Sequence, residues 1–268
     1  MQFAMTSDYL ADTGSPESAL RAIAAAGWKY VHWCHHWNDD FLYGLHELAQ
    51  LEAWLKELGL GMLDIHASHG REKAWDSARE YERQAGVDLV KNRLEMAARL
   101  GCRVIILHPA RTKAEGGPKR WDSLRRSLTD LLPDLRRLGV RIAIENMAEP
   151  DTFDQLDQLM AEFSPEVAGL CYDSGHGCIA GNGLDRLAPL APRLIALHLN
   201  DNDGQGDLHQ PPFMGRVDWA RLAGIVRQSG YDRPAMSVEV VVKNSGLPDE
   251  GAFLRQTLER VQRFGTLL

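Results

Sequence analysis

Histidine, aspartate and glutamate side chains close six short apolar runs of this sequence. Imidazole nitrogens and carboxylate oxygens are the ligands that proteins offer to zinc, manganese and magnesium ions. A single such residue after a strand is usually structural, because it can hydrogen-bond, pair with an arginine or cap a turn. Six at the same end of successive runs predict a common metal site. They are His66 in LDIHASHG, His108 in IILHPA, Glu145 in IAIENM, Asp173 in LCYDSGHG, His198 in LIALHLND and Glu239 in SVEV.

Three further residues of ligand type follow these runs closely. His176 comes three residues after Asp173, and Asp207 and His209 lie in the polar loop NDNDGQGDLHQPP. A buried carboxylate without a positive partner costs several kcal/mol, so a metal ion is the simplest partner for the acidic members. No cysteine stands at these positions. The ligand types leave the choice among Zn, Mn and Mg open.

Eight short apolar runs alternate with segments of helical spacing, and this alternation must bring the polar residues together. The apolar runs span residues 2–5, 28–33, 60–66, 102–108, 140–145, 167–172, 194–199 and 235–242. The helical segments span residues 15–27, 45–59, 87–101, 121–139, 152–163, 183–193, 217–230 and 251–265. Strict alternation over eight units predicts an α/β fold, the (β/α)8 TIM barrel, whose strands converge with their carboxyl ends on one face.

We expect one domain over residues 1–268, since this length and a hydrophobic fraction of 44% suffice for one barrel core. An open doubly wound sheet is the alternative fold. Its two nucleotide-binding signatures are missing, because no GxGxxG follows the first run and no GxxxxGK[ST] occurs.

Composition narrows the classes of partner. A net charge of −7 disfavours nonspecific binding to nucleic acid or to an anionic membrane. The first residues do not read as a secretory leader, and no apolar run reaches the ~20 residues of a membrane helix, so we expect a cytoplasmic protein. The four cysteines form no CxxC pair, and we expect no disulfides. A homo-oligomer is left open.

The segments that carry these residues resemble the xylose isomerase-like barrel superfamily nearly end to end. The most specific are IHASHG, LHPA, IENM, CYDSGHG, LHLNDND, DLHQPPFMGRVDW and SVEV. This superfamily joins sugar isomerases and epimerases with abasic-site nucleases of the endonuclease IV type. The resemblance to the epimerases implies one metal ion and four ligands, which are here Glu145, Asp173, His198 and Glu239.

The nuclease branch implies a larger site with three zinc ions. The resemblance to it adds five ligands, which are here His66, His108, His176, Asp207 and His209. The chain keeps the whole set, unlike many epimerases with a single metal ion. The number of ions, from one to three, is therefore left open.

The first functional hypothesis is a divalent-metal-dependent isomerase or epimerase of a sugar, keto-sugar or sugar phosphate. Metal bound to adjacent carbonyl and hydroxyl oxygens acidifies the C–H bond between them, so a carboxylate can remove the proton and leave a metal-stabilised enediolate. Glu145 and Glu239 are the candidate acid/base pair, and His176 would position a hydroxyl group.

The alternative is an endonuclease IV-like multi-zinc phosphodiesterase acting on abasic-site DNA, which the nine ligands favour. The acidic net charge and short loops after the early runs argue against a DNA partner. A barrel that binds sugar or metal without turnover is a third hypothesis, which the two glutamates disfavour. Basic residues after the fourth run form either a solvated helix surface or a phosphate site: Arg111, Lys113, Lys119, Arg120, Arg125 and Arg126.

Aromatic side chains could wall a substrate pocket, because sugar C–H faces pack on aromatic rings. The candidates are Trp33, Trp37, Phe41, Trp75 and Phe213. The segment HWCHHW, residues 32–37, follows the second run on the same rim and could also line the pocket. Five other histidines are not predicted as metal ligands by their place in the pattern: His32, His35, His36, His46 and His69.

Overall fold

The computed structural model describes residues 1–37, 41–67, 72–149, 151–247 and 249–268, so His69 lies outside the described residues. Within these ranges eight parallel strands close into a barrel, in which each strand pairs with the next and β8 pairs with β1. The predicted (β/α)8 barrel is confirmed. The strands are β1 Gln2–Thr6, β2 Tyr30–Trp33, β3 Gly61–His66, β4 Val104–Leu107, β5 Arg141–Glu145, β6 Ala168–Asp173, β7 Leu194–Leu199 and β8 Ala235–Val238.

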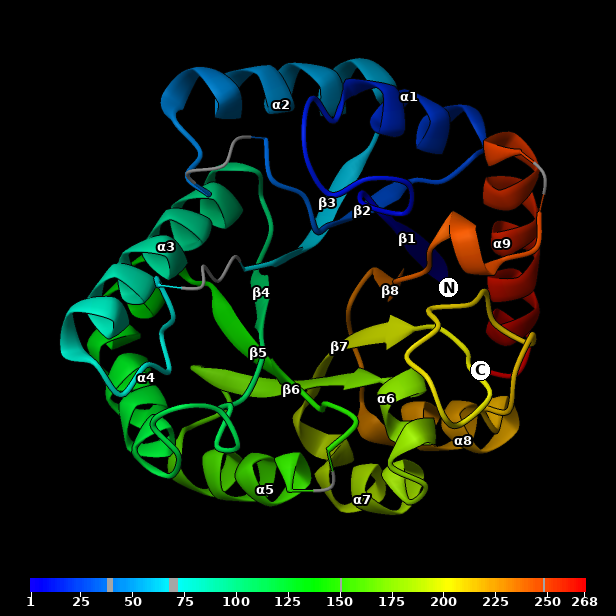
Figure 1. Cartoon of the computed structure of the whole chain (residues 1–268). Coiled ribbons are helices and arrows are strands. Elements are labelled where there is room, and N and C mark those ends of the chain that lie inside the picture. Colours follow the sequence, from blue (N-terminus) through cyan, green and yellow to red (C-terminus); the bar gives the residue numbers. More distant parts are fainter. Residues whose placement is uncertain (38–40, 68–71, 150, 248) are drawn as a thin grey trace.

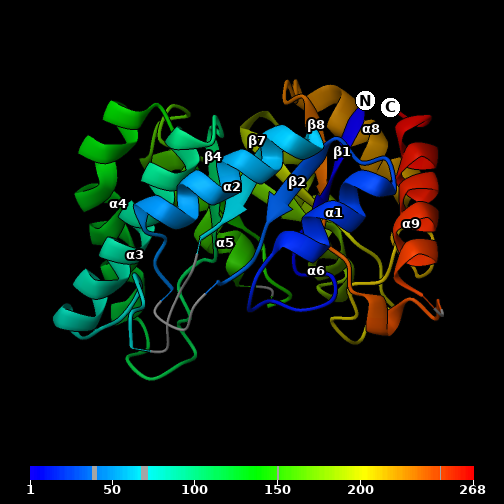
Figure 2. The same ribbon diagram turned by 90° about the horizontal axis from the view of Figure 1, so that it is seen from above.

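Helices surround the strands as an outer ring (Figure 1). They are α1 Glu17–Ala25, α2 Leu45–Leu58, α3 Glu80–Arg99, α4 Lys119–Leu138, α5 Thr152–Glu162, α6 Ser174–Ile179, α7 Gly183–Leu190, α8 Trp219–Ser229 and α9 Glu250–Gly265. Figure 2 shows both termini at one end of the barrel, opposite the loop that follows β4. Among the described helices, none combines the length and the apolar character needed to cross a bilayer.

The two faces of strand β5 belong to different cores. On β5, Ala143 lies in a small core inside the barrel, whereas its neighbours on the strand pack into the main core beneath the helices. Side chains alternate along a strand, so Glu145, two residues after Ala143, also points inward. Asp173 on β6 and His198 on β7 likewise follow by two residues a side chain of the inner core, Cys171 and Ala196 respectively, and therefore also point inward. Alternation therefore directs the polar strand ends into the barrel mouth.

Two elements differ from the sequence expectation. Helix α3 begins at Glu80, seven residues before the predicted start at Val87, although Gly86 interrupts its apolar pattern. A Cβ atom at Gly86 would lie 2.3 Å from the backbone nitrogen of Trp75, so glycine permits this close approach. Helix α6 was not predicted, because its six residues contain two glycines and no apolar repeat.

Candidate metal centre

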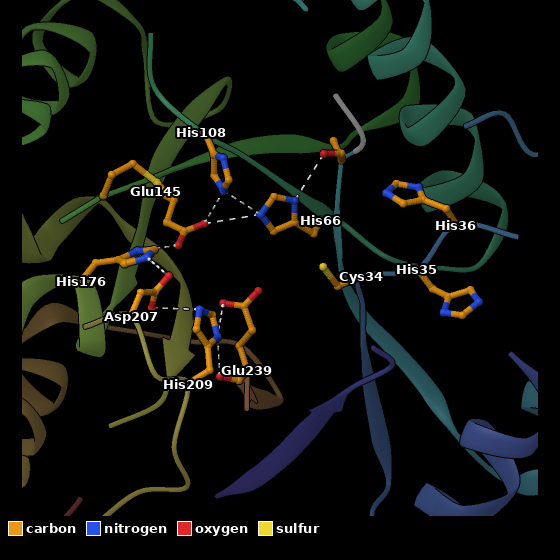
Figure 3. Close-up of a pocket in the computed structure, with 12 residues that line it drawn as sticks. Cys34, His35, His36, His66, His108, Glu145, His176, Asp207, His209 and Glu239 are labelled. Atoms are coloured by element: carbon orange, nitrogen blue, oxygen red, sulfur yellow. Dashed lines mark hydrogen bonds and ion pairs between the residues drawn. The ribbon is translucent and has the colours of Figure 1, made fainter. Parts of the chain in front are cut away.

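A cavity of about 250 Å³ opens at the carboxyl ends of the strands. Figure 3 shows imidazole and carboxylate groups pointing into it from several elements. Its lining consists of Cys34, His35, His36, His66, Ala67, His108, Glu145, Met147, His176, Asp207, His209 and Glu239. Seven of the nine predicted ligands thus line one cavity, and the remaining two, Asp173 and His198, lie buried against it.

A central group forms where β5, β6, β7 and β8 end. Glu145, Asp173, His198 and Glu239 each offer one ligand atom, and these four atoms lie within 4.8 Å of one another. His198 Nδ1 is 3.0 Å from Glu239 Oε2 and 3.3 Å from Glu145 Oε1. These are the four residues that the resemblance to the epimerases assigns to a single metal ion.

A second group lies at the ends of β3, β4 and β5. His66 Nε2 is 3.1 Å from His108 Nε2, and both nitrogens are 3.5 Å from Glu145 Oε2. Two imidazole nitrogens that face each other beside a carboxylate can converge on one cation. Glu145 is shared, because its other oxygen faces the central group.

A third group joins helix α6 to the loop before α8. Asp207 Oδ1 is 3.0 Å from His209 Nε2, and Asp207 Oδ2 is 3.4 Å from His176 Nε2. His209 has a φ of 46°, a left-handed backbone that is uncommon for a residue other than glycine. Its Nδ1 lies 3.1 Å from the backbone oxygen of Glu239, which fixes the ring beside the cavity. Strained backbone of this kind concentrates at functional sites.

Histidines stabilise the ionised forms of the two glutamates. Burial opposes their ionisation, but the charge of His198 and the hydrogen bonds of neighbouring histidines hold the pKa of Glu145 well below its usual range. His198 has the same effect on the pKa of Glu239, again against the penalty of burial. Both carboxylates are therefore available as anions.

The carboxylates in turn favour protonated imidazoles. Burial opposes the charge of His176, yet Asp173 and Asp207 raise its pKa to about 12. The hydrogen bond with Asp207 overcomes burial and raises the pKa of His209 to about 10. Protons balance the carboxylates when these pairs hold no cation, and a metal ion that binds here must displace them.

Several buried ligand atoms face one another in ion-pair contacts without making a hydrogen bond, an arrangement that suits a cation between them. Within the described residues, Glu145 Oε2 and both ring nitrogens of His198 are buried without a hydrogen bond. An unsatisfied buried polar atom costs about 1–3 kcal/mol, and more where it is charged. The donor set, imidazole and carboxylate converging from several strands, therefore fits divalent metal.

Asparagines that the sequence reasoning missed hold the central ligands in place. Asn200 Nδ2 donates to Asp173 Oδ2 at 2.6 Å, and the backbone nitrogen of His176 donates to Asp173 Oδ1 at 2.6 Å. Asp173 therefore caps helix α6, and it also faces the four-ligand group, so its capping role does not exclude a role as metal ligand. Asn146 Nδ2 donates to the backbone oxygen of Asp173 at 3.1 Å. Two positions in the sequence could have pointed to these residues: Asn146 directly follows Glu145, and Asn200 ends the segment LHLN.

None of the five predicted aromatic walls lines this cavity among the described residues. Trp33 is buried in the main core, because its neighbour His32 points inward and alternation turns Trp33 outward. Trp37 stacks on Trp54, and Phe213 packs on Trp219. Phe41 meets His36 edge to face. Trp75 joins the main core and borders a smaller cavity beside His108. The cavity wall is built from imidazoles instead.

Five of the six basic residues after β4 make ion pairs, and two of these five also line a cavity. Arg111 and Lys113 line a second cavity of about 400 Å³, which shares His108 and Met147 with the first. Three others make ion pairs with acids on neighbouring elements: Arg120 with Asp76, Arg125 with Glu162 and Arg126 with Glu80. Lys119 begins helix α4.

Sequence comparison shows the family of this chain, and fold comparison agrees on the barrel. Residues 20–261 match the model of the xylose isomerase-like TIM barrel, and the chain belongs to this family. Protein y4fM of Sinorhizobium fredii is 29% identical over 243 residues, which cover 81% of this chain and 78% of that protein. The probable endonuclease 4 of Staphylococcus carnosus is 25% identical over 199 residues, 66% of each chain. A solved D-tagatose 3-epimerase-like protein superposes with a TM-score of 0.80 at 18% identity, covering 100% of this chain and 98% of that one.

Proposed function

We propose that this protein is a divalent-metal-dependent isomerase or epimerase of a sugar, keto-sugar or sugar phosphate. The observation that carries the proposal is that Glu145 and Glu239, from β5 and β8, line one cavity of about 250 Å³ around a four-ligand metal group. This volume lies below the ~300–1,000 Å³ of pockets for drug-sized ligands, which favours a small polar substrate. The family and the epimerase fold are consistent with this class.

Glu145, Asp173, His198 and Glu239 would hold the ion of the central group. A bound divalent ion would polarise the substrate's carbonyl and hydroxyl oxygens and acidify the C–H bond between them. Zinc, manganese and magnesium all accept these ligands. Measuring which metal the protein binds would decide among them.

The protein's own groups can transfer the proton. Glu239 can accept the proton, because its Oε2 contacts His198 whereas its Oε1 has His32 Nε2 at 3.8 Å, beyond hydrogen-bond distance. Glu145 faces the cavity from β5 and would return the proton. Return to the same carbon from the opposite face inverts the centre, and return to the neighbouring carbon isomerises the sugar. The cationic form of His176 would donate to a substrate hydroxyl.

Deuterium exchange tests the acid/base assignment. The variants Glu145→Gln and Glu239→Gln are incubated in D₂O with free and phosphorylated keto-sugars, beginning with D-tagatose, and exchange at carbon is followed by NMR. Glu95→Gln is the control, because Glu95 pairs with Arg137 on the outer surface. We expect exchange in the control and its loss in both site variants. Unchanged exchange in either variant would remove that residue from the proton transfer.

Hydrolysis of a phosphate ester is the second candidate, favoured by one observation. The two outer groups, His66/His108/Glu145 and His176/Asp207/His209, also have their ligand atoms within 4.8 Å of one another, as the central group does. Three ions around one cavity would suit activation of water and stabilisation of a leaving oxygen, and the sequence likeness to a probable endonuclease 4 points the same way.

Metal content and one substrate separate the two candidates. One ion per chain with exchange at carbon supports the isomerase. Three zinc ions with efficient, chelator-sensitive incision of an abasic-site duplex would replace it by the phosphodiesterase. Hydrolysis of a small sugar phosphate without DNA incision would restrict the second candidate to small esters.

A further inference from the structure

A fourth set of ligand atoms lies on the β2 side of the cavity. His32, Cys34 and Glu239 each contribute one ligand atom, and these atoms lie within 4.8 Å of one another. Strand β2 carries His32, and Cys34 follows directly after its end. Figure 3 shows the Cys34 sulfur pointing into the cavity between His66 and Glu239. The Cys34 backbone nitrogen donates to Ser7 Oγ at 2.9 Å, which fixes this loop residue.

His32 is oriented as metal-binding histidines are. It is fully buried, and its Nδ1 lies 2.8 Å from Asp64 Oδ1. Ser237 Oγ lies 2.9 and 2.7 Å from the two Asp64 oxygens, so that carboxylate is fixed in turn. His32 Nε2 faces the cavity side, is buried, and has no hydrogen-bond partner among the described residues. A carboxylate that holds one imidazole nitrogen while the other nitrogen binds an ion is the common arrangement around protein metals.

The two oxygens of Glu239 face different groups. Oε2 lies 3.0 Å from His198 Nδ1 in the central group, whereas Oε1 lies 3.8 Å from His32 Nε2. A carboxylate placed in this way can bridge two ions, as in paired metal sites with ions about 3.5–4 Å apart. An ion held by Oε1 would occupy the oxygen that the proposed reaction needs as proton acceptor.

We propose that His32, Cys34 and Glu239 form a binding site for a thiophilic divalent ion, Zn²⁺ or Co²⁺, and that its occupancy inhibits the enzyme. Binding breaks the Cys34 S–H bond and the Nε2–H bond of the protonated His32 ring, forms metal–sulfur and metal–nitrogen bonds, and releases both protons to solvent. A thiolate ligand selects against Mg²⁺ and Mn²⁺. The binding site stands independently of the reaction, whereas the inhibition rests on the proposed function.

Cobalt spectroscopy tests the binding site. Metal-free wild-type protein and the variants Cys34→Ser, Cys34→Ala and Cys178→Ser are titrated with Co²⁺ and followed by absorption. We expect a thiolate-to-cobalt band in the near ultraviolet for wild type and Cys178→Ser, and its loss in both Cys34 variants with one fewer ion bound per chain. Cys178 is the matched control, since it is half-buried in α6 outside the four ligand groups.

Each outcome supports or overturns the site. Cobalt that binds wild type without a thiolate band, or a band that survives in both Cys34 variants, would overturn the fourth site and leave the central metal group intact. Failure of the full chain to bind cobalt or zinc would overturn the fourth site, and failure to bind manganese and magnesium as well would overturn the proposed function. Because two Cys34 variants are compared, a folding defect in one does not decide the result.

The inhibition is tested separately by the exchange assay. Enzyme loaded with its activating metal is exposed to excess Zn²⁺, and exchange at the substrate carbon is measured. We expect loss of exchange in wild type and in Cys178→Ser, and retained exchange in the Cys34 variants. Equal inhibition of all four proteins would overturn the inhibitory role even where the cobalt spectra support the site.

Discussion

Replacing Asn200 by alanine is expected to weaken metal binding in the central group by about 10- to 100-fold. Asn200 Nδ2 donates to Asp173 Oδ2 at 2.6 Å, and both side chains are fully buried. A hydrogen bond to a charged group contributes about 1.5–3 kcal/mol, and each 1.4 kcal/mol changes a dissociation constant about tenfold. Without this donor, the buried Asp173 carboxylate takes up a proton more readily, and that proton competes with the metal.

Zinc affinity is measured by competition with a chromophoric chelator, alongside circular dichroism of the metal-free protein. Asn202→Ala is the matched control, because Asn202 is also buried but donates to the backbone oxygen of Gly175 rather than to a ligand. Both variants are expected to lose some stability, but only Asn200→Ala should lose affinity. Unchanged zinc affinity in Asn200→Ala, or an equal loss in Asn202→Ala, would refute the role assigned to this hydrogen bond.

Two predictions concern stability. The folded-state pKa values of His176 and His209, about 12 and about 10, lie above the ordinary value of 6.5, so their stabilisation is complete below pH 6.5 and is lost as pH rises toward 10 and beyond. The free energy of unfolding, measured with urea in the presence of a chelator, should therefore fall over this pH range. The fall should be smaller in His209→Gln, and an equal fall in that variant would contradict the role assigned to His209. Gly86→Ala should lower the free energy of unfolding by about 1–3 kcal/mol through collision with Trp75, whereas Gly224→Ala, in helix α8 with nothing closer than 3.7 Å, should raise it by up to about 1 kcal/mol. Thermal denaturation of both variants measures these effects. Equal effects of Gly86→Ala and Gly224→Ala would contradict the close packing of Gly86 against Trp75.

The barrel and the convergence of Glu145, Asp173, His198 and Glu239 could be predicted because they depend on simple periodicities. Apolar runs and helical spacing define the strands, and alternation along a strand carries Glu145 and His198 inward once their smaller neighbours fill the barrel. The strand ends of a barrel meet on one face whatever the loops do. The pattern of polar residues at strand ends was therefore informative.

The aromatic walls and the asparagines could not be predicted in this way. Trp33 and His32 are adjacent, and only the register of β2 decides which of them faces the cavity. Asp64 lies in the middle of β3, and its partner Ser237 is 173 residues away, so no local pattern reveals that pair. Asparagine after a strand is common in ordinary turns, which hides the role of Asn200.

If metal ions bind on both sides of Glu145, this residue would make their binding interdependent. Its Oε2 faces His66 and His108, while its Oε1 faces His176 and His198. An ion bound to one oxygen of Glu145 would reduce the negative charge that the other oxygen offers to a second ion. The second ion would therefore bind less tightly than the first. Linkage makes this penalty reciprocal, whichever side fills first. Ions are therefore expected to leave one after another during chelation, and the metal content of a preparation will depend on its history.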